Sequence, residues 1–292
     1  MNENITAMVF TFNEERRLPF VFQNLDGFCR IIVFDGGSTD GTEAFCKEKN
    51  INFIRRPADS YTYTDTSRQI EGMWPEILKF AYSKCMTEYV LHVLCSHFYP
   101  PALLREFDIV ASEGKKTALY NDAIYWRYGS IVHQAFLRRV PCVCVFYKKS
   151  IIDFTRTKIH DELGIVFDER TMVRLRAHNS NSLHVFQDES CVSFTRKTIT
   201  YAEIEAAGQI GIASKYGLLA GLSKALLRFL YRYFRLGSFR FRSEGLAYAV
   251  LNLQYDIQIA LTVWENVNGY GGSQRAQRND EVRVALLSDA VK

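Results

Sequence analysis

The sequence predicts an α/β protein with a helical C-terminal extension, and three observations lead to this prediction. Strand and helix signals alternate along the first hundred residues, the strand candidates are short apolar runs, and the pattern after residue 201 is helical almost to residue 268. Alternating strands and helices call for a parallel sheet with right-handed crossovers. Apolar runs without polar alternation are typical of central strands that are buried on both faces.

The elements of the first half can be placed in order along the chain. The strand candidates cover residues 5–11, 30–34, 51–54 and 89–94, and the helix candidates cover residues 13–24, 41–49 and 66–83. Residues 118–147 are rich in β-branched and aromatic types, which predicts two or three further strands, some of them antiparallel.

The second half is helical, with a break near residues 236–238, and a polar tail starts at residue 271. We therefore expect an α/β domain over residues 1–200, a helical extension over residues 201–270 and a polar tail over residues 271–292.

Composition limits the classes of function. The chain has 292 residues, 48% of them hydrophobic, and its net charge of +4 is too mild to predict nucleic-acid binding by itself. The seven cysteines are odd in number and scattered, which fits neither a secreted disulfide framework nor a zinc site. The first ten residues lack the basic region of a signal peptide, and no apolar run of about 18 residues is present. We expect a cytoplasmic protein without a spanning helix.

Acid and amide side chains follow the first two strands, within the segments TFNEE (11–15) and FDGGSTD (34–40). Because the carboxyl ends of parallel strands meet at one edge of a sheet, we expect four residues to lie close together there: Asn13, Glu14, Asp35 and Asp40. Such acceptors suit a base and ribose hydroxyls, and glycines let the backbone approach a phosphate. The pattern predicts a nucleotide site.

Two alternatives remain for these residues. The first is capping: Asn13 can cap the helix that comes after it, because asparagine is a favoured N-cap residue. Asp40 and Glu43 form a D-x-x-E start signal for the next helix. A dinucleotide-binding fold is less well supported, because GxGxxG is missing after the first strand.

The pairing of TFNEE with IIVFDGGSTDGT resembles the N-terminal half of the family 2 inverting glycosyltransferases of GT-A fold. Within that family, later segments are similar to bacterial lipopolysaccharide-core and related polysaccharide transferases. KIHDELGI (158–165) resembles their HE-x-L motif, SFTRKTITYAEIEA (193–206) resembles their K-x-x-x-Y-x-x-x-A helix, and residues 226–250 resemble their membrane-proximal helices. The likeness extends from about residue 4 to about residue 266.

The resemblance implies a donor site for a nucleotide sugar, with a UDP-sugar as the expected donor. The donor-binding residues it implies are Thr11, Asn13, Glu14, Asp35, Gly37 and Arg68, with Asp35 on the base and Arg68 near the phosphates. It also implies that Asp161 is the catalytic base, in the place of the family's glutamate, and Glu162 is the fallback. In an inverting transfer, such a carboxylate takes the proton from the acceptor hydroxyl.

The strand at 89–94 departs from the family. There it ends in D-x-D, whose carboxylates help to hold Mg²⁺ or Mn²⁺ on the diphosphate, but the aligned residues are Leu94, Cys95 and Ser96, followed by His97. Hard cations prefer oxygen ligands. Three possibilities stay open: His97, His92 or an acid elsewhere rebuilds a metal site, Arg68 and other cations replace the metal, or catalysis is lost.

A basic amphipathic stretch covers residues 221–242, with six basic, six aromatic and no acidic residues. An apolar set at helical spacing (Leu227, Leu230, Tyr231, Phe234) and a basic set (Arg228, Arg232, Arg235) lie on different predicted faces. Contact with anionic lipid, a nucleic-acid face and simple packing on the domain are the alternatives. The aromatic residues favour lipid, and we expect Arg228, Arg232 and Arg235 to contact the membrane.

These expectations combine into one function. We expect an inverting glycosyltransferase that moves a sugar to a lipid-linked or surface-polysaccharide acceptor, for lipopolysaccharide, capsule or exopolysaccharide assembly. It would lie on the inner face of the cytoplasmic membrane and bind no nucleic acid. The alternative is an inactive pseudo-glycosyltransferase that binds nucleotide sugar or serves as a scaffold, although the retained HDEL segment favours activity. A sugar nucleotidyltransferase is a weaker third interpretation, because no glycine-rich loop with Arg and Lys comes after the first strand.

Overall fold

The structure is a computed structural model that describes residues 2–56, 67–127, 129–134, 143–154, 165–166, 168, 170–175, 181–186, 190–213, 217–269 and 277–284. The chain divides into two compact units, Met1–Asp188 and Glu189–Lys292. Each unit is described by itself.

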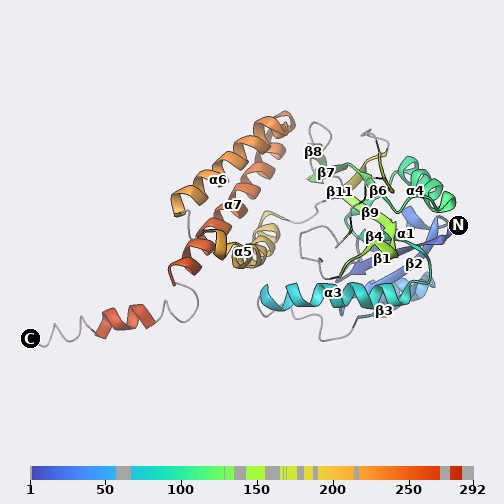
Figure 1. Ribbon diagram of the computed structural model, residues 1–292, viewed down its shortest axis with the longest axis horizontal. Helices are drawn as coiled ribbons and strands as arrows, with labels where there is room; N and C mark the ends of the chain where they lie inside the picture. Colours follow the sequence, from blue (N-terminus) through green and yellow to red (C-terminus); the bar gives the residue numbers. More distant parts are fainter. Residues whose placement is uncertain are drawn as a thin grey trace, which may run out of the picture. The chain divides into compact units, whose positions relative to one another are not determined.

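The first unit is built on a seven-stranded mixed sheet of strand order β10-β6-β9-β4-β1-β2-β3 (Figure 1). Its strands are β1 (Asn2–Thr11), β2 (Cys29–Asp35), β3 (Asn52–Arg55), β4 (Tyr89–Leu94), β6 (Ala118–Asn121), β9 (Val143–Lys148) and β10 (Met172–Arg174). Central β1 runs parallel to both β2 and β4, and β2 runs parallel to β3. Strand β9 is antiparallel to β4 and β6. The carboxyl ends of four neighbouring strands, β3-β2-β1-β4, therefore meet at one edge.

Four helices pack against this sheet: α1 (Leu18–Leu25), α2 (Thr42–Glu48), α3 (Ser67–Lys84) and α4 (Pro101–Glu113). Alternate residues of β1 enter two different cores, as the strand period requires. Val9 belongs to a cluster with buried residues of α1, α2 and α4, whereas Met8 belongs to a cluster with buried residues of α3. The prediction that the central strands are buried on both faces is confirmed.

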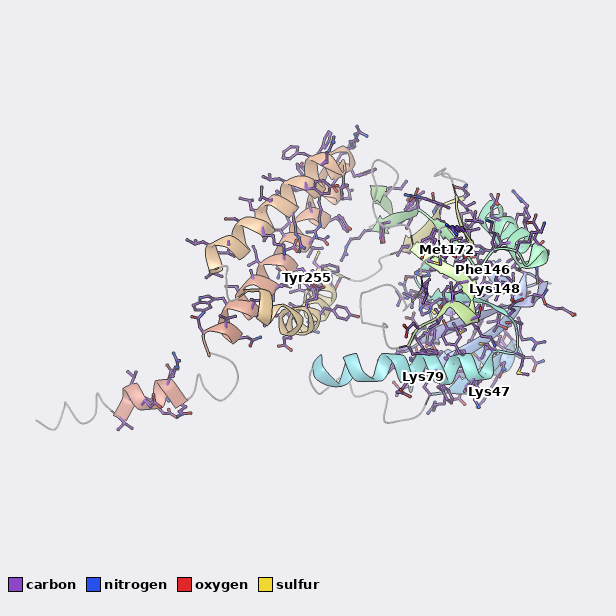
Figure 2. All side chains as sticks on the ribbon, in the orientation of Figure 1. Lys47, Lys79, Phe146, Lys148, Met172 and Tyr255 are labelled. Carbon is purple, nitrogen blue, oxygen red and sulfur yellow. The ribbon has the colours of Figure 1, made fainter. Side chains whose placement is uncertain are left out.

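A four-stranded second sheet has the order β5-β11-β7-β8. Its strands are β5 (His97–Phe98), β7 (Ala123–Arg127), β8 (Ser130–Gln134) and β11 (Leu183–Phe186). The hairpin β7–β8 is antiparallel, which confirms the antiparallel strands predicted between residues 118 and 147. In the main sheet, Phe146 lies on β9 within the first unit (Figure 2). Its ring stacks on that of Phe107 of α4, with ring centroids 4.6 Å apart.

Helix α1 differs from its predicted range of 13–24, because it begins at Leu18. The backbone of Asn13 has a φ of 54°, and a turn in which the N–H of Arg17 donates to the carbonyl of Glu14 precedes the helix. A left-handed residue cannot belong to a right-handed helix. Residues 13–17 therefore form a loop at the edge of the sheet.

The second unit consists of helices. They are α5 (Cys191–Ala213), α6 (Leu218–Leu230), a π-helical turn (Tyr231–Arg235), a 3₁₀ helix (Ser238–Phe241) and α7 (Arg242–Val267), followed by a short helix at 277–284. The side chains of Ala202, Ala206, Ile259 and Val263 form the core between α5 and α7. The hydroxyl of Tyr255 also donates a hydrogen bond to Glu205 of α5. Among the described helices, none has the length and apolar character needed to cross a membrane.

The predicted α/β class with a helical C-terminal extension is thus confirmed, and so is the predicted break near residues 236–238.

Candidate functional site

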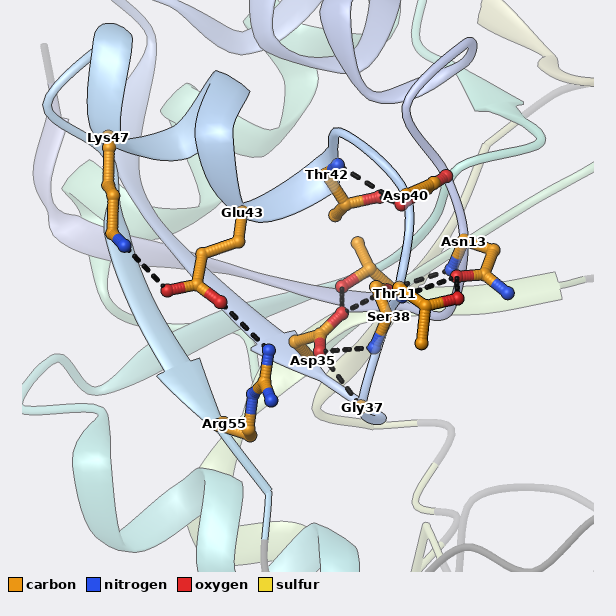
Figure 3. A network of polar contacts seen from close by, with 11 residues as sticks. Thr11, Asn13, Asp35, Gly37, Ser38, Asp40, Thr42, Glu43, Lys47 and Arg55 are labelled. Carbon is orange, nitrogen blue, oxygen red and sulfur yellow. Dashed lines mark hydrogen bonds and ion pairs between the residues drawn. The ribbon is translucent and has the colours of Figure 1, made fainter.

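The loops after β1 and β2 are locked together by hydrogen bonds (Figure 3). The N–H of Asn13 donates to Ser38 Oγ at 2.8 Å, and the N–H of Thr39 donates back to Asn13 Oδ1 at 2.8 Å. The N–H of Glu14 donates to Thr42 Oγ1 at 2.9 Å. The two segments singled out from the sequence are therefore brought together, as the topology predicts.

Asp35 lies at the centre of this arrangement and is fully buried. Its Oδ2 accepts the N–H groups of Gly37 and Ser38, both at 2.8 Å, and its Oδ1 accepts the hydroxyls of Thr11 and Ser38 (Figure 3). Four hydrogen-bond donors of the protein itself thus occupy the carboxylate that the resemblance implies should bind the base of the donor nucleotide. In this arrangement Asp35 shapes the loop, and Gly37 supports the turn with a φ of 89° that favours glycine.

Asp40 lies just before helix α2, whose N-cap residue is Gly41 and which has no side-chain cap, so the predicted D-x-x-E capping of this helix by Asp40 is not observed. Its Oδ1 accepts the N–H and the hydroxyl of Thr42, and its Oδ2 accepts the N–H of Glu15. Partial burial acts to raise the pKa of Asp40, but these hydrogen bonds act more strongly together and lower it. Glu15 completes the lock, because its Oε2 accepts the N–H of Gly41 at 3.0 Å.

The carboxylate of Glu14 forms a bidentate ion pair with Arg17. Both of its oxygens lie 2.6 Å from guanidinium nitrogens, and the Glu14 side chain is 12% exposed. The pair lies near the buried thiol of Cys95, whose pKa is raised by burial and then by the charge of Glu14, while Arg17 acts in the opposite direction. Glu14 is at the predicted edge, with its charge matched by a neighbour.

Arg56 is a residue of this edge that the sequence analysis missed. It directly follows β3 and is buried, its backbone N–H donates to the carbonyl of Asp35 at 2.8 Å, and its Nη2 donates to the carbonyl of Thr11 at 3.0 Å. The guanidinium carbon lies 5.7 Å from the centre of the Phe10 ring, within the range of a cation–π contact. Arg56 follows an edge strand that is not buried, but the position of a polar residue at the end of a predicted parallel strand could have pointed to it as it did to Asp35.

The end of β4 carries the residues that replace D-x-D. Leu94 is exposed, Cys95 is buried, and Nδ1 of His97 lies 3.1 Å from the hydroxyl of Tyr99. Burial lowers the pKa of His97 to about 3, with a smaller effect from His92, so the imidazole is neutral at pH 7. Tyr99 is itself held by α1, because Asn24 exchanges two hydrogen bonds with its backbone.

These residues do not fit Mg²⁺ or Mn²⁺, which prefer several oxygen ligands. The set Leu94, Cys95, Ser96 and His97 offers one side-chain oxygen, and burial raises the pKa of the only thiol, so that it stays protonated. In the described part of the chain, no three His, Cys, Asp or Glu side chains are grouped to hold a metal ion.

Three predicted residues cannot be placed in the site. Asp161 and Glu162 lie outside the described residues, and Arg68 lies in α3 with a side chain outside the described part.

The arginines predicted to contact the membrane belong to the second unit. Nη1 of Arg228 lies 2.7 Å from Oδ1 of Asp256 on α7, and Arg232 binds the other oxygen of the same buried carboxylate. Arg235 is exposed. Two of the three arginines therefore have a partner within the helical unit.

Comparison with known proteins gives structural likeness only. No protein-family model and no curated protein sequence matches the chain. A crystal structure of S. aureus TarS 1-349 in complex with UDP-GlcNAc is 11% identical with a TM-score of 0.46, covering 91% of this chain and 92% of that one. In a longer TarS structure, 55% of that chain is covered, at 11% identity and a TM-score of 0.45. Glucosyl-3-phosphoglycerate synthase from Mycobacterium tuberculosis in complex with phosphoglyceric acid is 14% identical with a TM-score of 0.44, covering 70% of this chain and 78% of that one.

Proposed function

We propose that the chain is an inverting glycosyltransferase of GT-A fold that transfers a sugar from a UDP-sugar to a lipid-linked or surface-polysaccharide acceptor. The observation that carries the proposal is the pair of interlocked loops at the carboxyl ends of β1 and β2. Ligands of open α/β sheets bind at this edge. The motif pairing that resembles family 2 transferases lies in these same two loops, which supports a nucleotide sugar as the ligand.

The donor would meet the loops mainly through backbone groups and exposed side chains. Thr11, Gly37 and Asp35 would set the shape of the nucleotide pocket, since the Asp35 carboxylate is already occupied. Asn13 is exposed at the same edge. Arg56 adds a positive charge beneath this edge, although its contacts with Thr11 and Asp35 make it a support for the pocket wall.

The chemistry would take the inverting route. Asp161, or Glu162 in its place, takes the proton from the acceptor hydroxyl, whose oxygen attacks the anomeric carbon from the face opposite the diphosphate. One C–O bond forms, the bond to the diphosphate breaks, and the nucleoside diphosphate leaves with the electron pair. Arg68 and other cations would balance the charge that develops on the leaving group.

Donor binding tests the proposal. Calorimetry against UDP-, GDP-, dTDP- and CMP-sugars, with and without Mn²⁺ or Mg²⁺, should show binding of a UDP-sugar that needs no metal. In a transfer assay, Asp161→Asn should lower turnover by roughly two to four orders of magnitude and leave the donor Kd nearly unchanged. A strict need for Mn²⁺ would contradict the cationic replacement, and no binding to any donor would contradict the assignment as a transferase.

A pseudo-glycosyltransferase is the second candidate, and the residues at the end of β4 favour it. A chain that has exchanged carboxylates for Leu94, Cys95 and Ser96 can still bind a nucleotide sugar or serve as a scaffold. In that case the donor would bind without turnover, and Asp161→Asn would change no measured rate.

The proposed acceptor also implies a location. A transferase that uses a nucleotide donor and a lipid-linked acceptor would work on the inner face of the cytoplasmic membrane, and it would bind that face peripherally.

A further inference from the structure

We propose that the junction of α6 with α7 is the part of the chain that docks on an anionic membrane surface. This junction surface consists of Tyr231, Phe234, Arg235, Phe239 and Arg240. The inference rests on the proposed function only for its lipid-linked acceptor. Of the three arginines predicted from the sequence to contact the membrane, it keeps Arg235 and leaves out Arg228 and Arg232.

The first step is that two of the predicted arginines face another helix. Gly221, Ala225, Arg228 and Arg232 succeed one another at spacings of four, three and four residues, which places them on one stripe of a helix. A Cβ on Gly221 would lie 2.9 Å from Ala260 Cβ, and Ala225 is buried. Arg228 and Arg232 bind Asp256. The stripe is therefore the contact with α7, and its charges are used to neutralise a buried carboxylate.

The second step concerns the π-helical turn. The N–H of Leu236 donates to the carbonyl of Tyr231 at 2.9 Å, five residues back, so this turn holds one residue more than an α-helical turn. An extra residue rotates the later positions about the helix axis by about 100°. A regular helix would place Arg235 on the stripe with Arg228 and Arg232, which bind Asp256. Arg235 is exposed and, among the described residues, has no such ion pair.

The third step is that large aromatic rings are exposed beside this arginine. Tyr231, Phe234 and Phe239 are 51%, 61% and 47% exposed. The rings of Phe234 and Phe239 are held in place by Tyr233, which contacts Phe234 with centroids 5.0 Å apart and Phe239 with centroids 6.4 Å apart. Little side-chain freedom is then left to lose on docking.

The charge of the junction surface is positive and unmatched nearby. Residues 217–243 include no acid. The guanidinium of Arg240 lies 5.7 Å from the Phe239 ring, and the part of the chain that the structure describes gives neither Arg235 nor Arg240 a carboxylate partner. The nearest acids along the chain are Glu244, which accepts a hydrogen bond from Ser243, and the paired Asp256.

Aromatic rings next to arginines fit a lipid interface better than a nucleic acid. Rings enter the boundary between headgroups and acyl chains, while guanidinium groups stay with anionic phosphates. The exposed side chains of Leu226, Leu227 and Leu230 extend the apolar surface along α6. A phosphate backbone would satisfy the arginines and leave these side chains in water.

Sedimentation of the full chain with vesicles tests the assignment. We expect binding to vesicles of phosphatidylglycerol and phosphatidylcholine, and little binding to phosphatidylcholine alone. Arg235→Glu with Arg240→Glu should weaken binding at least roughly tenfold, because each arginine near an anionic surface contributes to affinity. Phe234→Ser with Phe239→Ser should also release the protein.

Matched controls come from exposed residues of the first unit. Arg105→Glu with Lys115→Glu makes the same change in net charge, and Phe20→Ser removes a ring that is 69% exposed on α1. Both controls should bind vesicles like the unaltered chain. An equal loss in the charge control, or full vesicle binding after the phenylalanine substitutions, would overturn the assignment.

Two more outcomes would overturn the assignment of this surface to lipid and assign it to another partner. Binding of duplex DNA or RNA without vesicle binding, or a dimer that the phenylalanine substitutions convert to monomers, would show that the surface serves a nucleic acid or a second copy. Donor calorimetry on the same variants keeps the proposals separate. If the junction variants no longer bind vesicles but keep the donor Kd of the unaltered chain, membrane docking and donor binding are independent.

Discussion

At the scale of single residues, Asp35 has the most demanding environment of the candidate site. Its buried carboxylate accepts four hydrogen bonds from three residues, and two of the donors are backbone N–H groups. Hydrogen bonds to a charged acceptor are stronger than those between neutral groups. The shape of the loop after β2 depends on this one side chain.

The substitution Asp35→Asn should therefore destabilise the protein and weaken donor binding together. An amide has one acceptor oxygen, so at least one buried N–H or hydroxyl would face an NH₂ group and lose its partner. The free energy of unfolding should fall by about 2–4 kcal/mol, measured by chemical denaturation. Asp26→Asn, at an exposed position after α1, is the control and should change it by less than about 0.5 kcal/mol. An Asp35 variant of unchanged stability that still bound no donor would mean that Asp35 contacts the donor itself.

The sequence predicted which residues gather at the edge, but not how they are used. Asn13, Glu14 and Asp35 could be located because they come after, or at the end of, buried strands that run in parallel. The partners of Asp35 could not be predicted, because they depend on the path of the backbone through Gly37 and Ser38. The ion pair of Glu14 with Arg17 also depends on the turn that delays α1.

At the scale of elements, strands were predicted to within a few residues and helices less closely. An apolar run such as β4 defines both ends of a buried strand. Helix α1 begins five residues later than predicted, because residues 13–17 first form a loop that hydrogen-bonds to the loop after β2. The π-helical turn was not predicted, because the i, i+3, i+4 spacing of apolar residues looks the same whether or not one residue is added. That one feature separates Arg235 from Arg228 and Arg232.

The contact between the 3₁₀ helix and α7 gives a prediction at this scale. A Cβ on Gly245 would lie 1.9 Å from the backbone oxygen of Ser238, which cannot move aside like the end of a side chain. Gly245→Ala should destabilise the helical unit by about 1–3 kcal/mol or more and weaken vesicle binding, because the junction surface is displaced.

Helical circular dichroism during thermal unfolding measures this effect. Gly217→Ala is the matched control, since no atom lies within 4 Å of its added Cβ. It should change stability by less than about 1 kcal/mol, the cost of an alanine at a helix N-cap. Equal effects of the two substitutions would argue against the close contact at Ser238.

At the scale of the whole molecule, we expect the two units to differ in their response to acid. All six histidines precede residue 189, so the helical unit has none. Burial lowers the pKa of His92 to about 4, from an ordinary value near 6.5. The unfolded chain takes up this proton near pH 6.5 while the folded chain does not, so stability is complete above that pH and is lost as pH falls toward 4.

We therefore expect the first unit to lose on the order of 2 kcal/mol of stability between pH 8 and pH 5 from His92. Scanning calorimetry at several pH values should show the transition of the α/β unit moving to lower temperature while the helical transition stays in place. His92→Phe, which keeps a ring beside Phe10, should remove about half of this dependence, because burial also lowers the pKa of His97 and leaves its share in place. A helical transition that moved equally would assign the effect to carboxylates in both units.

The division into an α/β part and a helical part could be predicted, because strand and helix signals alternate along the first part while the signals of the second part are helical almost throughout. The order of the antiparallel strands could not, because β9 pairs with strands far from it in sequence.

The interlocked loops also restrict how this protein can change during evolution. Asn13 holds Thr39 and Glu15 holds Gly41, so neither loop keeps its contacts if the other gains or loses a residue. An insertion or deletion in one of these loops would need a matching change in the other. The turn at Gly114, which ends α4, is not linked to these two loops in this way, so its length can change by itself. Among descendants of this chain, insertions should therefore collect away from the carboxyl ends of β1 and β2.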